Sequence, residues 1–189
     1  TQAIEIEEVE ELLPWQLRGK AARALRVMKT FMFTDIVKST NLVEALGDDA
    51  WTDLVRWHDE ALRSLFATHK GEEIGSTGDG FFVGFDSPER AVACAVAIQR
   101  RFAEHRKQHG FGPQVRIGLH ASGAAQVGKH FRGKGVHEAA RIAALAQGGE
   151  ILASRATVGS DVPYPVSEPR SVTLKGISEP VEVVSVKWR

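Results

Sequence analysis

The chain has 189 residues, 43% of them hydrophobic and 25% charged, which is the composition of an ordinary globular protein of one domain with an appendage. Its 24 basic and 24 acidic side chains cancel, so nothing in the net charge indicates a nucleic acid or an anionic membrane as partner. No apolar run is long enough to span a membrane, and the single cysteine, Cys94, lies in an apolar helical run. We therefore expect a buried thiol and a reducing, cytoplasmic compartment.

Residues 1–28 differ from the rest of the chain. An acidic segment with apolar residues at near-helical spacing ends at Pro14, and a basic segment from Gln16 to Met28 follows. We interpret residues 1–28 as a linker or helical lead-in. Because the chain begins with Thr1 rather than Met, we expect it to connect an upstream regulatory or enzymatic domain to the domain formed by residues 29–189.

From residue 29 onward, helical and alternating apolar patterns follow one another in mixed order. The predicted helices are 39–46, 50–69, 88–109 and 133–146. The predicted strands are 30–34, a hairpin over 72–85, 115–120, a hairpin arm over 121–132, 151–154, 171–174 and 181–187. This order predicts an α+β domain, with one sheet covered by helices on one face.

Residues 31–40 form an apolar run that carries one carboxylate, Asp35, to its end before a polar turn and a helix. An acid at the mouth of a helix N-terminus fits a metal-bound polyphosphate, with the carboxylate on the metal. The backbone N–H groups from Ile36 through Val37, Lys38 and Ser39 to Thr40 would then face phosphate oxygens, with the Lys38 ammonium beside them. The alternative is an ordinary turn in which Asp35 or Ser39 caps the helix.

A second stretch, residues 71–85, has the pattern of two short strands joined at Gly78-Asp79-Gly80. It places a second lone carboxylate, Asp79, in a tight turn whose glycines permit close backbone approach. Two carboxylates on two strand ends suit a hard divalent cation beside phosphates. The alternative is that Asp79 only forms the turn.

Six short motifs follow one another over about residues 29–188. They are Phe33-Thr34-Asp35-Ile36-Val37 with Ser39-Thr40, Gly78-Asp79-Gly80-Phe81, Arg116-Ile117-Gly118-Leu119-His120, Gly135-Val136-His137-Glu138-Ala139-Ala140-Arg141, Gly149-Glu150-Ile151-Leu152-Ala153-Ser154 and Leu174-Lys175-Gly176. In order and spacing this series resembles the class III nucleotidyl cyclases, adenylate and guanylate, and most of all the bacterial and actinobacterial catalytic domains.

The resemblance implies a ferredoxin-like cyclase fold with a mostly antiparallel central sheet and a short arm hairpin. It also implies a homodimer with two composite sites at its interface, and two Mg²⁺ or Mn²⁺ ions per site. The implied reaction is attack of the 3′-hydroxyl of a nucleoside triphosphate on its α-phosphate, which yields a 3′,5′-cyclic nucleotide and pyrophosphate.

By the same resemblance, Asp35 and Asp79 are the metal ligands, and the Ile36 carbonyl assists them. Arg141 matches the arginine that stabilises the transition state, for which a helix-surface ion pair is the alternative. Lys175 matches the lysine that binds the terminal phosphates, and a simple turn lysine before Gly176 is weighed equally.

Base recognition departs from the family pattern. Gly75 stands where adenylate cyclases have the lysine that contacts adenine, and His130 stands where its Asp or Thr partner is expected. His137 replaces the asparagine that orients the ribose, and a neutral imidazole still donates one hydrogen bond. The arginine that begins the arm in some heteromeric relatives has no counterpart near Gly123.

These residues predict an adenylate cyclase that makes cyclic AMP from ATP in signal transduction, with low activity and weak base selection, since discrimination depends on polar contacts to the base. GTP remains an alternative substrate. A second hypothesis is a degenerate cyclase domain that serves as a nucleotide-binding or dimerising regulatory module. A nucleic-acid-binding domain on the same fold is disfavoured by the neutral charge.

Overall fold

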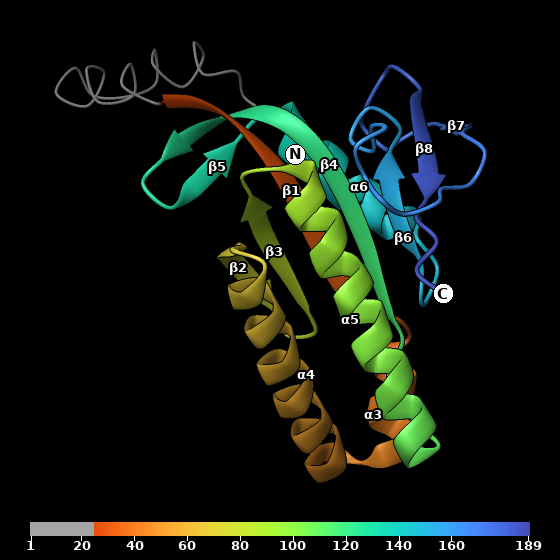
Figure 1. The fold of residues 1–189 in the computed structure, drawn as a ribbon. Coiled ribbons are helices and arrows are strands. Elements are labelled where there is room, and N and C mark those ends of the chain that lie inside the picture. The colour runs from red at the N-terminus through yellow and green to blue at the C-terminus, as the bar shows by residue number, and fades with distance from the viewer. Residues whose placement is uncertain (1–24) are drawn as a thin grey trace, which may run out of the picture.

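The computed structural model describes residues 25–189, which form one mixed sheet with helices on both of its faces (Figure 1). The helices are α3 (Ser39–Leu46), α4 (Asp48–Thr68), α5 (Pro88–His109) and α6 (Lys134–Leu145). The strands are β1 (Leu25–Ile36), β2 (Glu72–Thr77), β3 (Gly80–Phe85), β4 (Val115–Val127), β5 (His130–Arg132), β6 (Ile151–Ser154), β7 (Arg170–Val172) and β8 (Val181–Ser185).

The sheet has eight strands in the order β2-β3-β1-β4-β6-β8-β7, and β5 pairs with β4 to form the arm. Among the described strands, β4 and β6 pair in parallel and the other pairs are antiparallel. The predicted α+β class, the mostly antiparallel sheet, the 72–85 hairpin and the arm hairpin are confirmed.

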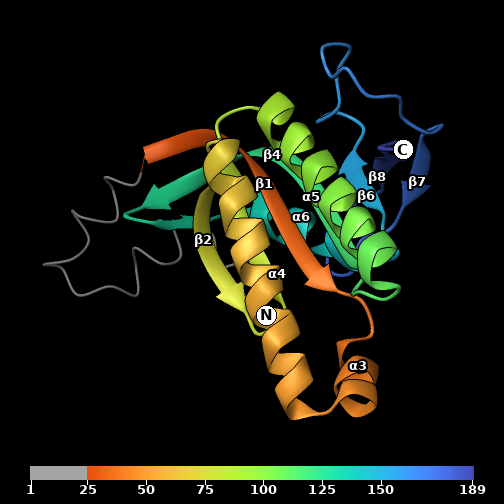
Figure 2. The ribbon, with the colours of Figure 1, turned by 60° about the horizontal axis from the view of Figure 1, so that its bottom comes forward.

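Alternating residues of β1 supply two separate apolar clusters, one on each face of the sheet. Met32 is buried among Leu62 of α4 and Phe102 of α5. Phe31, its neighbour, is buried on the other face with Ala139 of α6. Side chains alternate along a strand, so this pattern places α4 and α5 on one face and α6 on the other, as Figure 2 shows. The expectation of helices on one face holds for α4 and α5 only.

Local signals mark both ends of α5. In α5, the Ser87 side chain accepts a hydrogen bond from the Arg90 N–H, Pro88 occupies the first turn, and Gly110 ends the helix in the left-handed conformation. Within the described residues, no helix is both long and apolar enough to cross a membrane.

Two boundaries differ from the prediction. β1 begins at Leu25, so residues 25–28 are strand and do not belong to a helical lead-in. The rest of the predicted lead-in lies outside the described residues. β4 continues to Val127, well beyond the predicted end at His120, because its second half pairs with both β1 and β5.

Candidate active site

The two predicted acids, Asp35 and Asp79, meet at one end of the sheet. β1 and β3 are antiparallel neighbours, and Asp35 is paired with Gly80, the residue after Asp79. The Ile36 N–H donates to the Asp79 carbonyl at 3.1 Å. Partial burial raises the pKa of the Asp35 carboxyl, the Arg116 guanidinium lowers it, and the nearby Asp79 carboxylate raises it. A cation bound between two such neighbouring carboxylates would relieve their mutual repulsion.

Gly80 fixes this convergence because no larger residue fits there. A Cβ atom on Gly80 would lie 2.1 Å from the Thr34 carbonyl oxygen, far inside contact distance. The Thr34 hydroxyl also accepts a hydrogen bond from the Phe81 N–H at 3.1 Å. The turn that carries Asp79 is thereby held against the end of β1.

Arg116 of β4 completes this end of the sheet. It is the direct cross-strand partner of Asp35, and its Nη2 and Nε atoms lie 2.6 and 3.1 Å from the same carboxylate oxygen, Oδ2. Its Nη1 atom donates to the Ala144 carbonyl at 3.1 Å. Arg116 therefore links Asp35 to the C-terminal turn of α6.

The N-terminus of α3 opens beside the acids. Its N-cap residue, Lys38, has left-handed backbone angles (φ 56°), and no side chain caps the helix. The alternative in which Asp35 or Ser39 caps α3 is therefore wrong. The N–H groups of Ser39 and Thr40 precede the first intrahelical hydrogen bond, from Leu42 to the Lys38 carbonyl, and this geometry favours anions.

The predicted phosphate loop is shorter than expected. The Ile36 N–H binds the Asp79 carbonyl, and the Val37 N–H binds the Gln114 carbonyl at 2.9 Å. Both N–H groups are used in backbone hydrogen bonds at the end of β1, so the prediction that they face phosphate oxygens is wrong. Val37 and Lys38 instead line a cavity of about 230 Å³, whose other walls are Asn41, Leu42 and residues 112–114. A larger open depression, of about 440 Å³ between Gly149 and Trp188, contains none of the predicted site residues.

The other predicted site residues point to solvent. His137 and Arg141 are exposed on α6, His130 is exposed at the start of β5, and Lys175 is exposed in the turn after β7. Within the described residues no hydrogen bond or ion pair joins these side chains to the two acids. The predicted site thus divides into an acidic centre at the end of β1 and an exposed group on other elements.

Gly75 lies in β2, at the irregularity between Glu73 and Gly75 in its pairing with β3. A Cβ atom there would have no neighbour within 4 Å. The position therefore has room for a side chain, and packing does not require a glycine.

Two contacts fix α6, which carries His137 and Arg141, against the sheet. A Cβ atom on Gly118 of β4 would lie 2.3 Å from the Ala143 nitrogen, so the helix backbone touches the strand directly. His120 lies between Glu138 of α6 and Ser154 of β6, with 2.7 Å from Nε2 to Oε2 and 2.7 Å from Nδ1 to Oγ. This network ties the helix to two strands.

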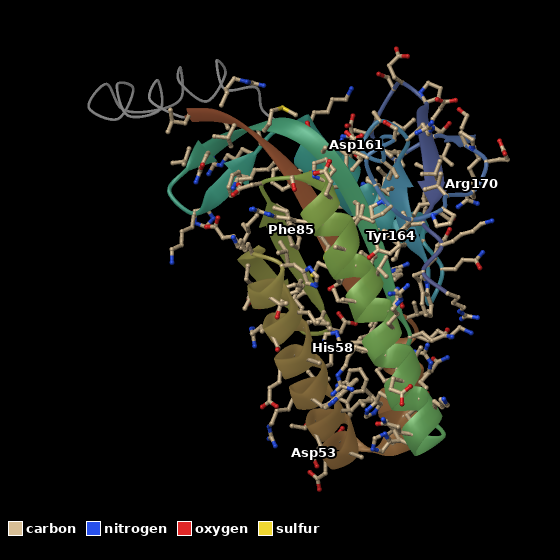
Figure 3. All side chains as sticks on the ribbon, viewed as in Figure 1. Asp53, His58, Phe85, Asp161, Tyr164 and Arg170 are labelled. Atoms are coloured by element: carbon tan, nitrogen blue, oxygen red, sulfur yellow. The ribbon has the colours of Figure 1, made fainter. Side chains whose placement is uncertain are left out.

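Sequence reasoning missed the roles of two residues near the acids. Arg116 was part of a family motif, but its contact with Asp35 depends on the β1–β4 register, which no local pattern reveals. His58 is fully buried on the side of α4 that faces α5 (Figure 3). Its Nδ1 lies 2.7 Å from an oxygen of Asp59, while its Nε2 has no partner.

Comparison with known protein families identifies the family of this chain. Residues 26–184 match the model of the adenylate and guanylate cyclase catalytic domain. The chain belongs to this cyclase family. The match covers both acids, Arg116 and all of α6, so the predicted membership in the class III nucleotidyl cyclases is confirmed.

Relatives of this cyclase domain occur in protozoa and bacteria. It is 27% identical to the receptor-type adenylate cyclase GRESAG 4.1 of Trypanosoma brucei brucei, over 82% of the chain and 16% of that protein. It is 30% identical to the putative adenylate cyclase 3 of Rhizobium meliloti, over 68% of the chain and 22% of that protein. The chain thus spans less than a quarter of the length of either relative.

A solved adenylate cyclase structure from Trypanosoma brucei, in its monomeric state, superimposes with a TM-score of 0.74. It is 26% identical, and the match covers 84% of this chain and 87% of that one. The fold of this chain is therefore that of a nucleotidyl cyclase catalytic domain, and the family description includes both nucleotide specificities.

The acidic centre fits a divalent cation that also binds phosphate. Among the described residues no group of three or more His, Cys, Asp or Glu side chains is arranged to hold a metal. Mg²⁺ is commonly held by one or two carboxylates together with substrate phosphates and water, so Asp35 and Asp79 are a sufficient protein donor set. A substrate bound at the α3 N-terminus would supply the remaining ligands.

Proposed function

We propose that this domain is an adenylate cyclase, which converts ATP to 3′,5′-cyclic AMP and pyrophosphate. The observation that carries the proposal is the meeting of Asp35 and Asp79 beside the uncapped N-terminus of α3. A carboxylate pair for cations next to free N–H groups for phosphates suits a metal-bound triphosphate better than other ligands.

Each side chain then has a role in the ring closure. When bound, two Mg²⁺ or Mn²⁺ ions lower the pKa of the 3′-hydroxyl and neutralise the triphosphate. Asp35 and Asp79 hold these ions, and Lys38 with the N–H groups of Ser39 and Thr40 binds phosphate oxygens. Arg141 offsets the charge that develops at the α-phosphate.

We further propose that the working unit is a homodimer. His137, Arg141 and Lys175 are exposed and make no contact with the acids, as expected for residues that complete the site of a second copy. In this arrangement His137 orients the ribose, and Lys175 binds the terminal phosphates of a nucleotide held by the partner's acids.

Base selection by this site is weak. Gly75 contributes no side chain to read the base, and His130 is exposed on the arm. Polar groups that would be left unpaired by the wrong base give high discrimination, and these positions supply few of them. We propose ATP as the main substrate and GTP as a tolerated one.

The test is product formation by purified protein with Mn²⁺ and either ATP or GTP, separated by chromatography. Asp35→Asn and Asp79→Asn preserve side-chain shape while removing the charge, and each is expected to lower the rate by about 100-fold or more. Formation of cyclic AMP that both variants lose supports the proposal. Absence of any cyclic product from dimeric protein overturns it.

A second candidate, a regulatory module that binds nucleotide without turnover, is favoured by the missing base contacts at Gly75 and His130. It predicts that ATP with Mn²⁺ raises the melting temperature while no cyclic product forms. Turnover that depends on Asp79 contradicts this candidate.

The open space at Gly75 gives a sharper test of base selection. Gly75→Lys is expected to fold normally, because a Cβ atom there meets no neighbour within 4 Å. It is expected to raise kcat/KM for ATP relative to GTP by about tenfold or more, since one hydrogen bond to the base is gained. An unchanged ratio, with Gly75→Ala as the matched control, would show that position 75 does not face the base.

A further inference from the structure

The contact between Arg116 and Asp35 has an unusual geometry for a cross-strand ion pair. Two nitrogens of one guanidinium, Nη2 and Nε, converge on a single carboxylate oxygen, Oδ2, at 2.6 and 3.1 Å. The usual fork-to-fork arrangement would use both carboxylate oxygens. Here the other oxygen of Asp35, Oδ1, takes no part in the contact with Arg116, and the Asp79 carboxylate lies near enough to raise the pKa of Asp35.

Charge explains why this arginine lies there. Asp35 and Asp79 repel each other across a partly buried gap, and the side chains of Arg116 and Asp35 are 31% and 32% exposed. Arg116 makes the one ion pair with Asp35 found among the described residues. The guanidinium thus supplies part of the positive charge that a divalent cation would bring.

Arg116 and a metal ion bound to Asp35 would compete for the negative charge of one carboxylate. An oxygen that binds Mg²⁺ lies about 2.1 Å from the ion, so an ion on either oxygen of Asp35 would lie close to the guanidinium, and the two cations would repel each other. The Nη1 contact with the Ala144 carbonyl does not involve Asp35. It anchors the guanidinium beside Asp35 independently of the ion pair.

We propose that Arg116 is a resident counter-cation of the carboxylate pair, which competes with the divalent cation for Asp35 and so sets the metal affinity of the site. This proposal rests on the proposed function only in taking Asp35 and Asp79 as metal ligands. It makes Arg116 a positioning residue: in the metal-free protein it holds and neutralises Asp35, and its charge opposes the binding of a divalent cation there.

The test measures Mn²⁺ binding without nucleotide, from the electron paramagnetic resonance signal of free Mn²⁺ during a titration. Arg116→Gln keeps hydrogen-bonding groups and removes the charge. A unit charge about 5 Å from a divalent ion changes its affinity by about tenfold even at the dielectric constant of water. We therefore expect Arg116→Gln to bind Mn²⁺ about tenfold more tightly than the wild type. Equal or weaker binding overturns the proposal.

Two further variants separate charge from packing. Arg116→Lys keeps the charge and is expected to bind Mn²⁺ within about threefold of the wild type. If it binds as tightly as Arg116→Gln, charge is not the cause and the proposal fails. Arg170→Gln is the matched control, because Arg170 (labelled in Figure 3) also faces a carboxylate, Glu150 at 3.6 Å, but lies in the edge strand β7, which is not a neighbour of β1 or β4. It should leave Mn²⁺ binding unchanged.

A double variant and a stability measurement complete the design. In an Asp35→Asn background, Arg116→Gln should no longer tighten Mn²⁺ binding; a tightening that persists would overturn the proposal. In EDTA, Arg116→Gln should melt below the wild type, because the carboxylates lose their counter-charge, and Mn²⁺ should raise its melting temperature more than that of the wild type. The Mn²⁺ titration contains no nucleotide, so it is independent of the product assay. If Arg116→Gln binds Mn²⁺ more tightly but the wild type forms no cyclic product, only the proposed function is refuted. If cyclic product forms but Arg116→Gln does not bind Mn²⁺ more tightly, only this inference is refuted.

Discussion

Gly118 offers the clearest test of how the sheet positions α6. In Gly118→Ala, the new Cβ atom would lie 2.3, 2.4 and 2.6 Å from the N, Cα and Cβ atoms of Ala143. An ordinary contact begins near 3.4 Å, so the helix must move away from β4 by about 1 Å. The obstacle is backbone, which no rotamer change can clear.

Forced overpacking of this kind costs about 2 to 3 kcal/mol. For a domain of this size, that loss lowers the melting temperature by about 4 to 12 °C, which circular dichroism measures directly. Gly159→Ala is the matched control, because a Cβ atom there meets nothing within 4 Å. If Gly118→Ala has the same melting temperature as the wild type, the close approach of α6 to β4 is wrong.

The same variant separates the two parts of the proposed site. Asp35 and Asp79 lie on β1 and in the β2–β3 turn, and Asp35 is joined to α6 only through Arg116, whose charge the variant keeps, so Mn²⁺ binding should change less than activity. Arg141 and His137 move with α6, so cyclase activity should fall by about tenfold or more, as small misplacements of catalytic groups do.

Two further outcomes follow from buried titratable groups. Burial lowers the pKa of both His58 and His120 against the opposing effects of Asp59 and Glu138, so the unfolded chain takes up protons first as the pH falls. The stability of the wild type should therefore be constant above about pH 6.5 and decline below it, and a melting temperature that stays level from pH 7.5 to about 5.5 would contradict this. Burial raises the pKa of the fully buried Cys94 thiol to about 12, so a thiol reagent should modify Cys94 only after unfolding; rapid labelling of the native protein would show otherwise.

Each acid of the acidic centre could be singled out from a local pattern, whereas the meeting of the two acids depends on the β1–β3 pairing and was implied only by the family resemblance. Asp35 ends an apolar strand and Asp79 sits in a Gly-Asp-Gly turn, and each signal can be read within about ten residues. The helix bounds were also local, since Ser87, Pro88 and Gly110 mark the ends of α5. Both predictions depended on short-range patterns that the fold leaves intact.

What was missed depends on pairing between distant segments. The Val37 N–H could be assigned to a phosphate only while its partner, the Gln114 carbonyl, was unknown. Arg116 reaches Asp35 through the β1–β4 register, across 81 positions of sequence. The face on which α6 packs was equally invisible, because helical periodicity predicts an apolar side but not which side of the sheet covers it.

β1 joins the arm to the acidic centre as one continuous element. Leu25 pairs with Gln126 in the arm, Asp35 pairs with Arg116 near the other end, and every residue of β1 between them is also paired with β4. At about 3.3 Å per residue, the β1–β4 strand pair extends about 33 Å from Leu25 to Asp35. A force applied to the arm therefore reaches the carboxylate without passing through a loop. A shift of the β1 register by two residues would move Asp35 about 7 Å along the sheet, away from Asp79 and Arg116. The pairing along the whole length of β1 and β4 therefore fixes the position of Asp35 in the site.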